Sequence, residues 1–277
     1  MKIIEVIETI KFFHQPYIWS DNTRDKVLCG DVQKECTGVA VTCCATYEVI
    51  KKCAERKLNL IISHEGITYN YEKKYDINCF ENEVVRKKID YAYDNDIVIW
   101  RDHDAMHGPF PKNNIREKTD LIFYGTMKEL GWEKYLIGDE KKPLWYKIPP
   151  IKAEKLGALL IEKWNLNGLR IVGNLDSTIS MVYMCEHVTG GEKDIAILDN
   201  CAKAEAIIPL EICDYTVTTY VRDAAAMGMN KVIFEMGHFN AEELGMKYLA
   251  NILSDIFVNR CPVEFIQSGD GFDYLLK

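Results

Sequence analysis

Apolar residues recur along this chain with two periods, one typical of helices and one typical of buried strands. Residues 2–13 place Ile3, Ile7 and Ile10 on one side of a helix. The same spacing predicts further helices at residues 47–57, 80–94, 119–130, 153–164 and 214–227. Short apolar runs between them predict strands at residues 38–45, 58–63, 96–100, 168–173, 178–186, 204–209 and 231–236. The chain therefore alternates helices with buried strands.

This alternation predicts an α/β fold with mainly parallel or mixed sheets, because a strand that follows a crossover helix usually returns parallel to the strand before it. At 277 residues, the chain has room for one large domain or two modest ones. The polar segment GDEKKP, residues 138–143, is the candidate boundary. We therefore expect two similar α/β halves, residues 1–140 and residues 141–277.

Two helix-and-strand units resemble each other, and each ends in a histidine. The first, ATYEVIKKCAERKLNLIISHEG, closes at His64, and the second, DYTVTTYVRDAAAMGMNKVIFEMGHFNAEE, closes at His238. Open α/β sheets hold their ligands at the carboxyl ends of their strands. Any helix followed by a strand shares part of this outline, but the paired histidines favour an internal duplication. We expect His64 and His238 to face one shared site.

Composition narrows the class of protein. The chain is 48% hydrophobic and 27% charged, and it lacks the apolar run of about 20 residues that a membrane helix needs. Glu5 and Glu8 interrupt the apolar pattern of the first helix, which argues against a signal peptide. The ten cysteines include no CxxC pair, so we expect reduced thiols in a cytoplasmic protein. A net charge of -8 makes a nucleic-acid partner unlikely.

The segment DHDAMHG follows a predicted buried strand and concentrates metal-binding chemistry. His103 and His107 lie four residues apart in it, together with Asp102 and Asp104. Imidazole and carboxylate are the usual ligands of zinc, iron and manganese. A solvated polar loop is the alternative interpretation. The pattern does not decide between His103 and His107 as the ligand.

Two other strand ends carry similar groups. His238 and Glu242 are spaced to share one face of a helix, although a capping histidine followed by a first-turn glutamate would look the same. At the end of residues 58–63, His64 lies between Ser63 and Glu65. Since four of the six histidines follow predicted strands, we expect these ends to converge on a metal site.

These residues also carry a resemblance to a known family. The segments SDNTRDKVLCGD, LNLIISHEG, IVIWRDHDAMHG, IIPLEICDYTV and EMGHFNAEELG are similar to those of the Nif3-like (NGG1-interacting factor 3-like) dinuclear metal-centre family, also described as GTP cyclohydrolase 1 type 2 homologues. The resemblance implies two α/β halves facing a metal pair and assembly into a homo-oligomer, commonly a hexamer. It also implies metal ligation by His64, His238 and Glu242.

Two positions depart from that family. Ser63 stands where most members have a histidine, and His107 stands where they have a ligating aspartate, while His103 matches the histidine that opens that motif. One of two metal positions is therefore altered or empty, with Glu65, Asp102 or Asp104 as candidate replacements.

The predicted function is a metal-dependent hydrolase of a small polar substrate, of the cyclohydrolase or amidohydrolase type, with one or two ions of Zn, Fe or Mn per chain. Glu65 or Asp104 is the candidate general base, and Glu211 is placed to orient the substrate or a ligand histidine. The alternative is a non-catalytic metal-binding interaction or regulatory protein. A nucleotide-binding regulator has less support because the chain has no Walker sequence.

Overall fold

The computed structural model describes residues 1–17, 19–68, 82–112 and 115–275, without the side chains of residues 109–118. The chain forms two compact units. Unit 1 comprises residues 1–126 and 243–268, and unit 2 comprises residues 127–242 and 269–277. The predicted halves, residues 1–140 and 141–277, divide the chain differently, because helix α8 (His238–Ile256) begins in unit 2 and continues into unit 1.

The centre of unit 1 is a five-stranded mixed sheet in the order β1–β4–β3–β2–β12. Strand β1 (Val27–Cys29) is antiparallel to β4, while the other neighbours are parallel. The strands that precede the predicted site are fully buried, which explains their continuous apolar runs. Their bounds, with that of the last strand, are β2 (Val39–Thr42), β3 (Leu60–Ser63), β4 (Val98–Arg101) and β12 (Val263–Phe265).

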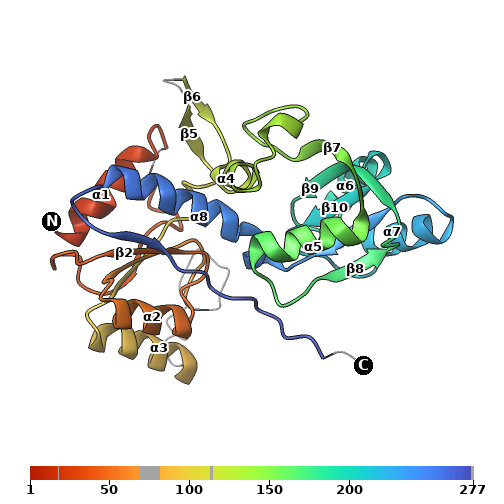
Figure 1. The fold of residues 1–277 in the computed structure, drawn as a ribbon. Coiled ribbons are helices and arrows are strands. Elements are labelled where there is room, and N and C mark those ends of the chain that lie inside the picture. The colour runs from red at the N-terminus through yellow and green to blue at the C-terminus, as the bar shows by residue number, and fades with distance from the viewer. Residues whose placement is uncertain (18, 69–81, 113–114, 276–277) are drawn as a thin grey trace. The chain divides into compact units, whose positions relative to one another are not determined.

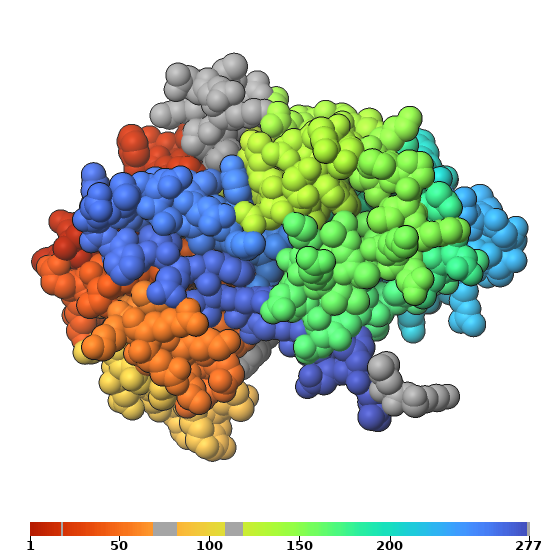
Figure 2. Space-filling model, viewed as in Figure 1, coloured from red at the N-terminus to blue at the C-terminus, as the bar shows by residue number. Residues whose placement is uncertain are grey.

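Helices cover both faces of this sheet (Figure 1). Helices α2 (Tyr47–Arg56) and α3 (Glu83–Asp94) lie side by side on one face, visible in orange and yellow in Figure 2. The Thr46 side chain accepts a hydrogen bond from the Val49 N–H and so caps α2. Helix α1 (Ile3–Phe13) and the unit 1 part of α8 cover the other face.

The remaining elements of unit 1 lie near the predicted site. Strands β5 (Pro109–Lys112) and β6 (Ile115–Lys118) pair as an antiparallel hairpin directly after DHDAMHG. Helix α4 (Leu121–Leu130) follows, and it crosses α8 closely where Gly125 meets Gly245. A Cβ added at Gly125 would lie 3.0 Å from the Gly245 Cα, so the crossing requires a small residue there.

Unit 2 has its own five-stranded mixed sheet, in the order β7–β9–β10–β11–β8. Its central strands, β9 (Thr178–Cys185), β10 (Ala206–Pro209) and β11 (Val232–Glu235), are parallel. The outer strands, β7 (Trp145–Lys152) and β8 (Arg170–Gly173), are antiparallel to their neighbours. The parallel centre sends three consecutive strand ends to one edge of the sheet.

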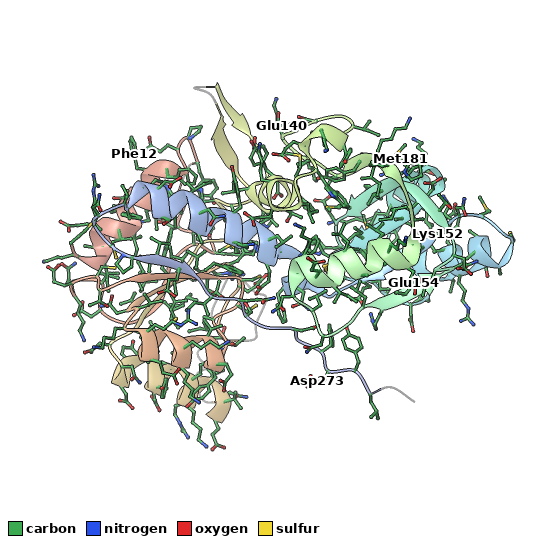
Figure 3. The ribbon with its side chains drawn as sticks, viewed as in Figure 1. Phe12, Glu140, Lys152, Glu154, Met181 and Asp273 are labelled. Carbon is green, nitrogen blue, oxygen red and sulfur yellow. The ribbon has the colours of Figure 1, made fainter. Side chains whose placement is uncertain are left out.

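Three helices complete unit 2. Helices α6 (Lys193–Lys203) and α7 (Val217–Ala226) pack on the sheet face that carries Ile207 and Ile233. Helix α5 (Ala153–Trp164) packs on the opposite face, where Gly157 contacts the Phe234 ring. Lys152 and Glu154 at the start of α5 are exposed (Figure 3). A short 3₁₀ helix (Glu133–Tyr135) precedes β7.

The predicted fold of two α/β halves with mixed sheets is confirmed. The amphipathic first helix is also confirmed, since Ile3, Ile7 and Ile10 are buried while Phe12 is 69% exposed. Strands β1, β7 and β12 and helix α6 were not predicted. The first two residues of the predicted helix 80–94 lie outside the described residues. Among the described helices, none combines the length and apolar character needed to cross a membrane.

Candidate metal centre

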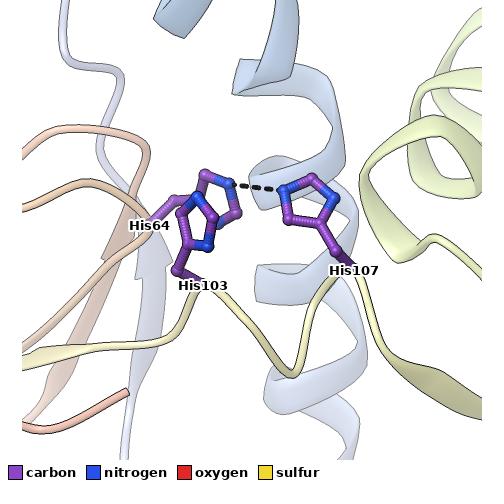
Figure 4. A group of neighbouring side chains, drawn as sticks. All are labelled: His64, His103 and His107. Atoms are coloured by element: carbon purple, nitrogen blue, oxygen red, sulfur yellow. Dashed lines mark hydrogen bonds between the residues drawn. The ribbon is translucent and has the colours of Figure 1, made fainter. Parts of the chain in front are cut away.

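Two strand ends in unit 1 bring together the histidines of the predicted site. His64 directly follows β3, and His103 and His107 follow the neighbouring parallel strand β4. Candidate ligand atoms of the three side chains all lie within 4.8 Å of one another, and Figure 4 shows their rings gathered at one point. The structure therefore brings these two strand ends together in unit 1.

His64 and His107 face each other through the same ring atom. Their Nε2 atoms are 3.2 Å apart, marked by the dashed line in Figure 4. The Nδ1 atom of His64 lies 3.1 Å from the backbone oxygen of Asp102, which can only accept a hydrogen bond. His64 Nδ1 is therefore the donor in this contact, and Nε2 is the ring atom directed at His107.

Asp120 fixes His107 in the matching state. Its Oδ2 atom lies 2.8 Å from His107 Nδ1, so this nitrogen donates to the carboxylate. The other carboxylate oxygen accepts the backbone N–H groups of Ile122 and Phe123 and caps the start of α4. Because the helix holds Asp120 and Asp120 holds the ring, the Nε2 lone pair of His107 is also directed at its partner.

His103 is held differently, although it belongs to the same group. Its ring stacks on His64, with centroids 4.4 Å apart. The Nδ1 atom contacts Asp104 at 3.1 Å, and an Arg24 guanidinium nitrogen lies 3.2 and 3.3 Å from its two ring nitrogens. Burial and the neighbouring His64 lower the pKa of His103 to about 2, so this ring is neutral. His103 therefore stacks on His64, whereas His64 and His107 face each other through their Nε2 atoms.

The two carboxylates predicted as general bases are each paired with an arginine. Glu65 accepts a hydrogen bond of 2.8 Å from Arg101, whose side chain is 5% exposed. Asp104 accepts from the Arg24 backbone N–H at 2.9 Å. Burial alone would raise the pKa of Asp104, but hydrogen bonds from His103 and Arg24 lower it below its usual range.

Three further side chains, Asp25, Ser63 and Asp102, form hydrogen bonds in or beside the loop of residues 102–108. Asp25 accepts three backbone N–H groups, from His103, Asp104 and Ala105, at 2.5 to 2.9 Å. The Ser63 hydroxyl bonds to backbone atoms of Ala45 and Glu65 rather than pointing at the histidines. Asp102 turns toward the buried His14, with 2.9 Å between Oδ2 and Nε2. Neither Ser63 nor Asp102 therefore supplies a ligand atom to the group that contains His64 and His107.

Unit 2 carries a second group at the carboxyl edge of its own sheet. His187, Glu211 and His238 follow the adjacent parallel strands β9, β10 and β11. The two oxygens of Glu211 lie 2.7 Å from His187 Nδ1 and 2.7 Å from His238 Nδ1. His238 directs Nε2 toward Glu242, at 3.4 Å, as the spacing of four residues on one helix predicts.

In the unit 2 group, the charged side chains of His238 and Glu211 are hydrogen-bonded to each other. Burial of His238 opposes its charged form, but hydrogen bonds to Glu211 and Glu242 raise its pKa to about 11. Burial likewise opposes the charge of Glu211, whereas the hydrogen bonds from His187 and His238 lower its pKa to about 2. Without a metal, His238 is an imidazolium held between two carboxylates.

Sequence reasoning missed several residues that shape these groups. His187 was not placed at a strand end, yet it follows β9 by two residues, and the strand-like pattern of residues 178–186 was sufficient to find it. Asp25 and Asp120 gave no signal, because their contacts reach across 78 and 13 residues, respectively. The prediction that the unit 1 and unit 2 groups line one shared site stays a prediction.

Comparisons with known proteins agree with this architecture. Residues 1–110 match the family model of Duf34/NIF3 (NGG1p interacting factor 3). A search of curated proteins finds no match. The solved structures that resemble the chain include the hypothetical protein SA1388 of Staphylococcus aureus, with 17% identity, a TM-score of 0.67 and 99% of each chain covered.

Two others extend that similarity. A Bacillus cereus protein related to NIF3 has 13% identity, a TM-score of 0.68 and 99% of each chain covered. TTHA1606 from Thermus thermophilus has 15% identity and a TM-score of 0.66, covering 98% of this chain and all of that one. At such identities the structural likeness establishes the fold. Together with the match over residues 1–110, it confirms the resemblance to the Nif3-like family.

Proposed function

We propose that this chain, Nif3-like by its family match and its fold, is a metal-dependent hydrolase of a small polar substrate. His64 and His107 hold one divalent transition-metal ion in unit 1. The observation that supports this proposal is the opposition of two Nε2 atoms at 3.2 Å, in rings whose Nδ1 atoms each face an acceptor.

Two imidazole Nε2 atoms 3.2 Å apart suit a shared cation, because a positive ion can accept both lone pairs. Zinc binds imidazole nitrogen at about 2.0–2.1 Å, and two such ligands on a tetrahedral ion lie about 3.3 Å apart. The separation of His64 and His107 Nε2 fits that value. The other occupant that satisfies the contact is a single proton, which would make one ring an imidazolium.

The donor set indicates the kind of ion. Imidazole nitrogen suits zinc, iron, cobalt and nickel better than magnesium or calcium. A divalent ion at this position supplies a Lewis acid, which lowers the pKa of a bound water to about 7. Asp120 keeps His107 in the tautomer that ligates, and the Asp102 backbone oxygen does the same for His64.

Other side chains take supporting roles in this proposal. Arg101 and Arg24 hold Glu65 and Asp104 in ion pairs, and we assign both carboxylates to positioning. In unit 2, His238 Nε2 and Glu242 form a half-site for an ion, and Glu211 orients His238 through Nδ1. Glu211 is thus a positioning residue for the ligand histidine, one of the two roles predicted for it.

Metal analysis tests the site. Protein purified without added metal, and protein reconstituted with Zn²⁺ or Mn²⁺, should carry one or two ions per chain by elemental analysis. We expect His64→Ala to lose the unit 1 ion and to keep its far-ultraviolet circular dichroism. The variant Lys152→Ala, on the exposed start of α5, is the control and should keep all metal. No ion in either wild-type preparation would contradict the site and leave the shared proton as the explanation.

Activity separates the hydrolase from the alternative of a non-catalytic metal-binding protein. Reconstituted wild-type protein should be incubated with GTP and with cyclic amides, and products measured by chromatography. We expect His64→Ala and Glu242→Ala to reduce any turnover at least about 100-fold. Stoichiometric metal binding without turnover of these compounds would contradict a cyclohydrolase or amidohydrolase function and favour the alternative. The hexamer implied by the family resemblance is tested separately, by sedimentation velocity.

A further inference from the structure

Two cysteines that are distant in the sequence meet in unit 1. The Sγ atoms of Cys36 and Cys261 lie 3.4 Å apart, although 225 positions separate the residues. Cys36 is half-buried, and Cys261 is 8% exposed. Both are free thiols in this structure.

Backbone contacts place each thiol firmly. The Cys36 N–H donates to the backbone oxygen of Met1 at 2.9 Å, which ties it to the start of the chain. The Cys261 N–H donates to the Phe257 oxygen at 3.2 Å, directly after α8 and before β12. The two sulfurs therefore link the N-terminal segment of unit 1 to the segment that returns from unit 2.

The contact lets each thiol support the thiolate of the other. Either sulfur can donate the hydrogen bond across the 3.4 Å contact. When one cysteine loses its proton, the S–H group of its neighbour donates to the thiolate, which is the nucleophilic form of cysteine.

We propose that Cys36 and Cys261 form a redox modification site that a two-electron oxidant such as hydrogen peroxide converts into a disulfide. The thiolate of one cysteine attacks one peroxide oxygen, the O–O bond breaks, and hydroxide leaves and takes a proton to become water. The sulfur of the other cysteine then loses its proton and attacks the sulfenic sulfur, and the hydroxide that it displaces takes that proton to become a second water. One peroxide is reduced to two waters, and two thiols are oxidised to one disulfide.

The structure requires little movement for this bond. A disulfide has an S–S length of about 2.0 Å, so the sulfurs must approach by about 1.4 Å from their contact distance. The cross-link would join the first 36 residues to the stretch between α8 and β12 and close a long loop in the unfolded chain. Such a loop restricts the unfolded state strongly, so the oxidised protein should resist unfolding more than the reduced one.

Peptide mapping tests the proposal on the full chain. Reduced protein is treated with one equivalent of hydrogen peroxide, remaining thiols are alkylated, and the digest is analysed by mass spectrometry. We expect a linked peptide pair containing Cys36 and Cys261, absent after dithiothreitol, and a rise of about 5 °C in the unfolding midpoint. Recovery of both cysteines as separate alkylated, sulfinic or otherwise paired species would overturn the proposal.

Variants show whether the stabilisation comes from this pair. Cys36→Ser and Cys261→Ser should each abolish the oxidant-dependent rise in the unfolding midpoint. Cys213→Ser is the matched control, because it removes a half-buried thiol that contacts Thr216, at 3.1 Å, and it should keep the rise. A rise that persists in Cys36→Ser would place the oxidised pair elsewhere. If either serine variant fails to fold, the peptide map of the wild-type protein decides alone.

Discussion

The histidine groups of the two units differ in the charges that surround their imidazole rings. In unit 1, His64 faces a backbone oxygen and another imidazole, and the neighbouring His103 has its pKa lowered to about 2. In unit 2, His238 lies between two carboxylates that raise its pKa to about 11. Burial opposes the charged form of both His103 and His238. At His103, the neighbouring His64, His107 and Arg101 add to burial and outweigh the hydrogen bond to Asp104, whereas at His238 the hydrogen bonds to Glu211 and Glu242 outweigh burial.

This difference teaches that two helix-and-strand units of similar pattern can prepare their histidines in opposite ways. Unit 1 directs the Nε2 atoms of His64 and His107 at each other. Unit 2 holds a protonated ring that must give up its Nε2 proton before it ligates an ion. A backbone oxygen orients His64 and a carboxylate orients His107 in unit 1, whereas a single carboxylate, Glu211, contacts both histidines of unit 2.

The largest expected effect comes from Asp25, which holds the loop of the unit 1 group. Asp25→Ala leaves the backbone N–H groups of His103, Asp104 and Ala105 without their acceptor. Each unsatisfied buried group costs about 1–3 kcal/mol, so we expect the free energy of unfolding to fall by at least about 3 kcal/mol. Urea unfolding followed by tryptophan fluorescence measures this change.

The control for Asp25 is Asp31→Ala, which removes an exposed aspartate that accepts a single backbone N–H, from Gln33 at 2.9 Å. It should lower the free energy of unfolding by less than about 1 kcal/mol. A similar loss in both variants would show that Asp25 does not hold the loop that carries His103 and His107.

Much of this architecture could be predicted from the sequence, because it depends on local pattern. The buried strands β2, β3, β4 and β11 are short apolar runs, and the chemistry after each run is visible in the letters that follow. Residues in contact across the fold could not be found this way. Asp25 and Asp120 are ordinary acidic residues until the chain folds, and only the folded loop brings them to His103 and His107.

Ser63 and His107, which depart from the family pattern, also make contacts that the sequence alone could not predict. Ser63 was identified as a departure from the family's histidine, but the sequence could not show that its hydroxyl would bond to the backbone of Ala45 and Glu65. The sequence also did not decide whether His103 or His107 is the ligand. The structure separates them, because Asp120 orients one ring, while Arg24 and Asp104 contact the other.

A smaller effect is expected when a carboxylate that orients a ligand histidine is changed, and it should lower the metal affinity of one unit at a time. In Asp120→Asn, the carbonyl oxygen keeps capping α4, so the amide NH₂ faces His107 Nδ1 and moves the ring proton to Nε2. We expect metal affinity in unit 1 to fall about 10–100-fold. Isothermal titration with Zn²⁺ measures it.

Glu211→Gln is the matched change in unit 2, because Glu211 supports His238 in the same way. It should weaken the unit 2 position by a comparable factor and leave unit 1 unchanged. If Asp120→Asn and Glu211→Gln weakened the same binding event, the two groups would not be independent positions, and the comparison between the units would fail.

The smallest effect is expected for His103, which shares the unit 1 group without facing His107 through a lone pair. His103→Asn removes a ring that stacks on His64 at 4.4 Å between centroids, while the asparagine amide can still donate to Asp104. Because Asp102 and Asp120 continue to orient His64 and His107, zinc affinity should change by less than about threefold. The same titration gives the value, and a loss as large as that of His107→Ala would make His103 a ligand and the unit 1 site a three-histidine one.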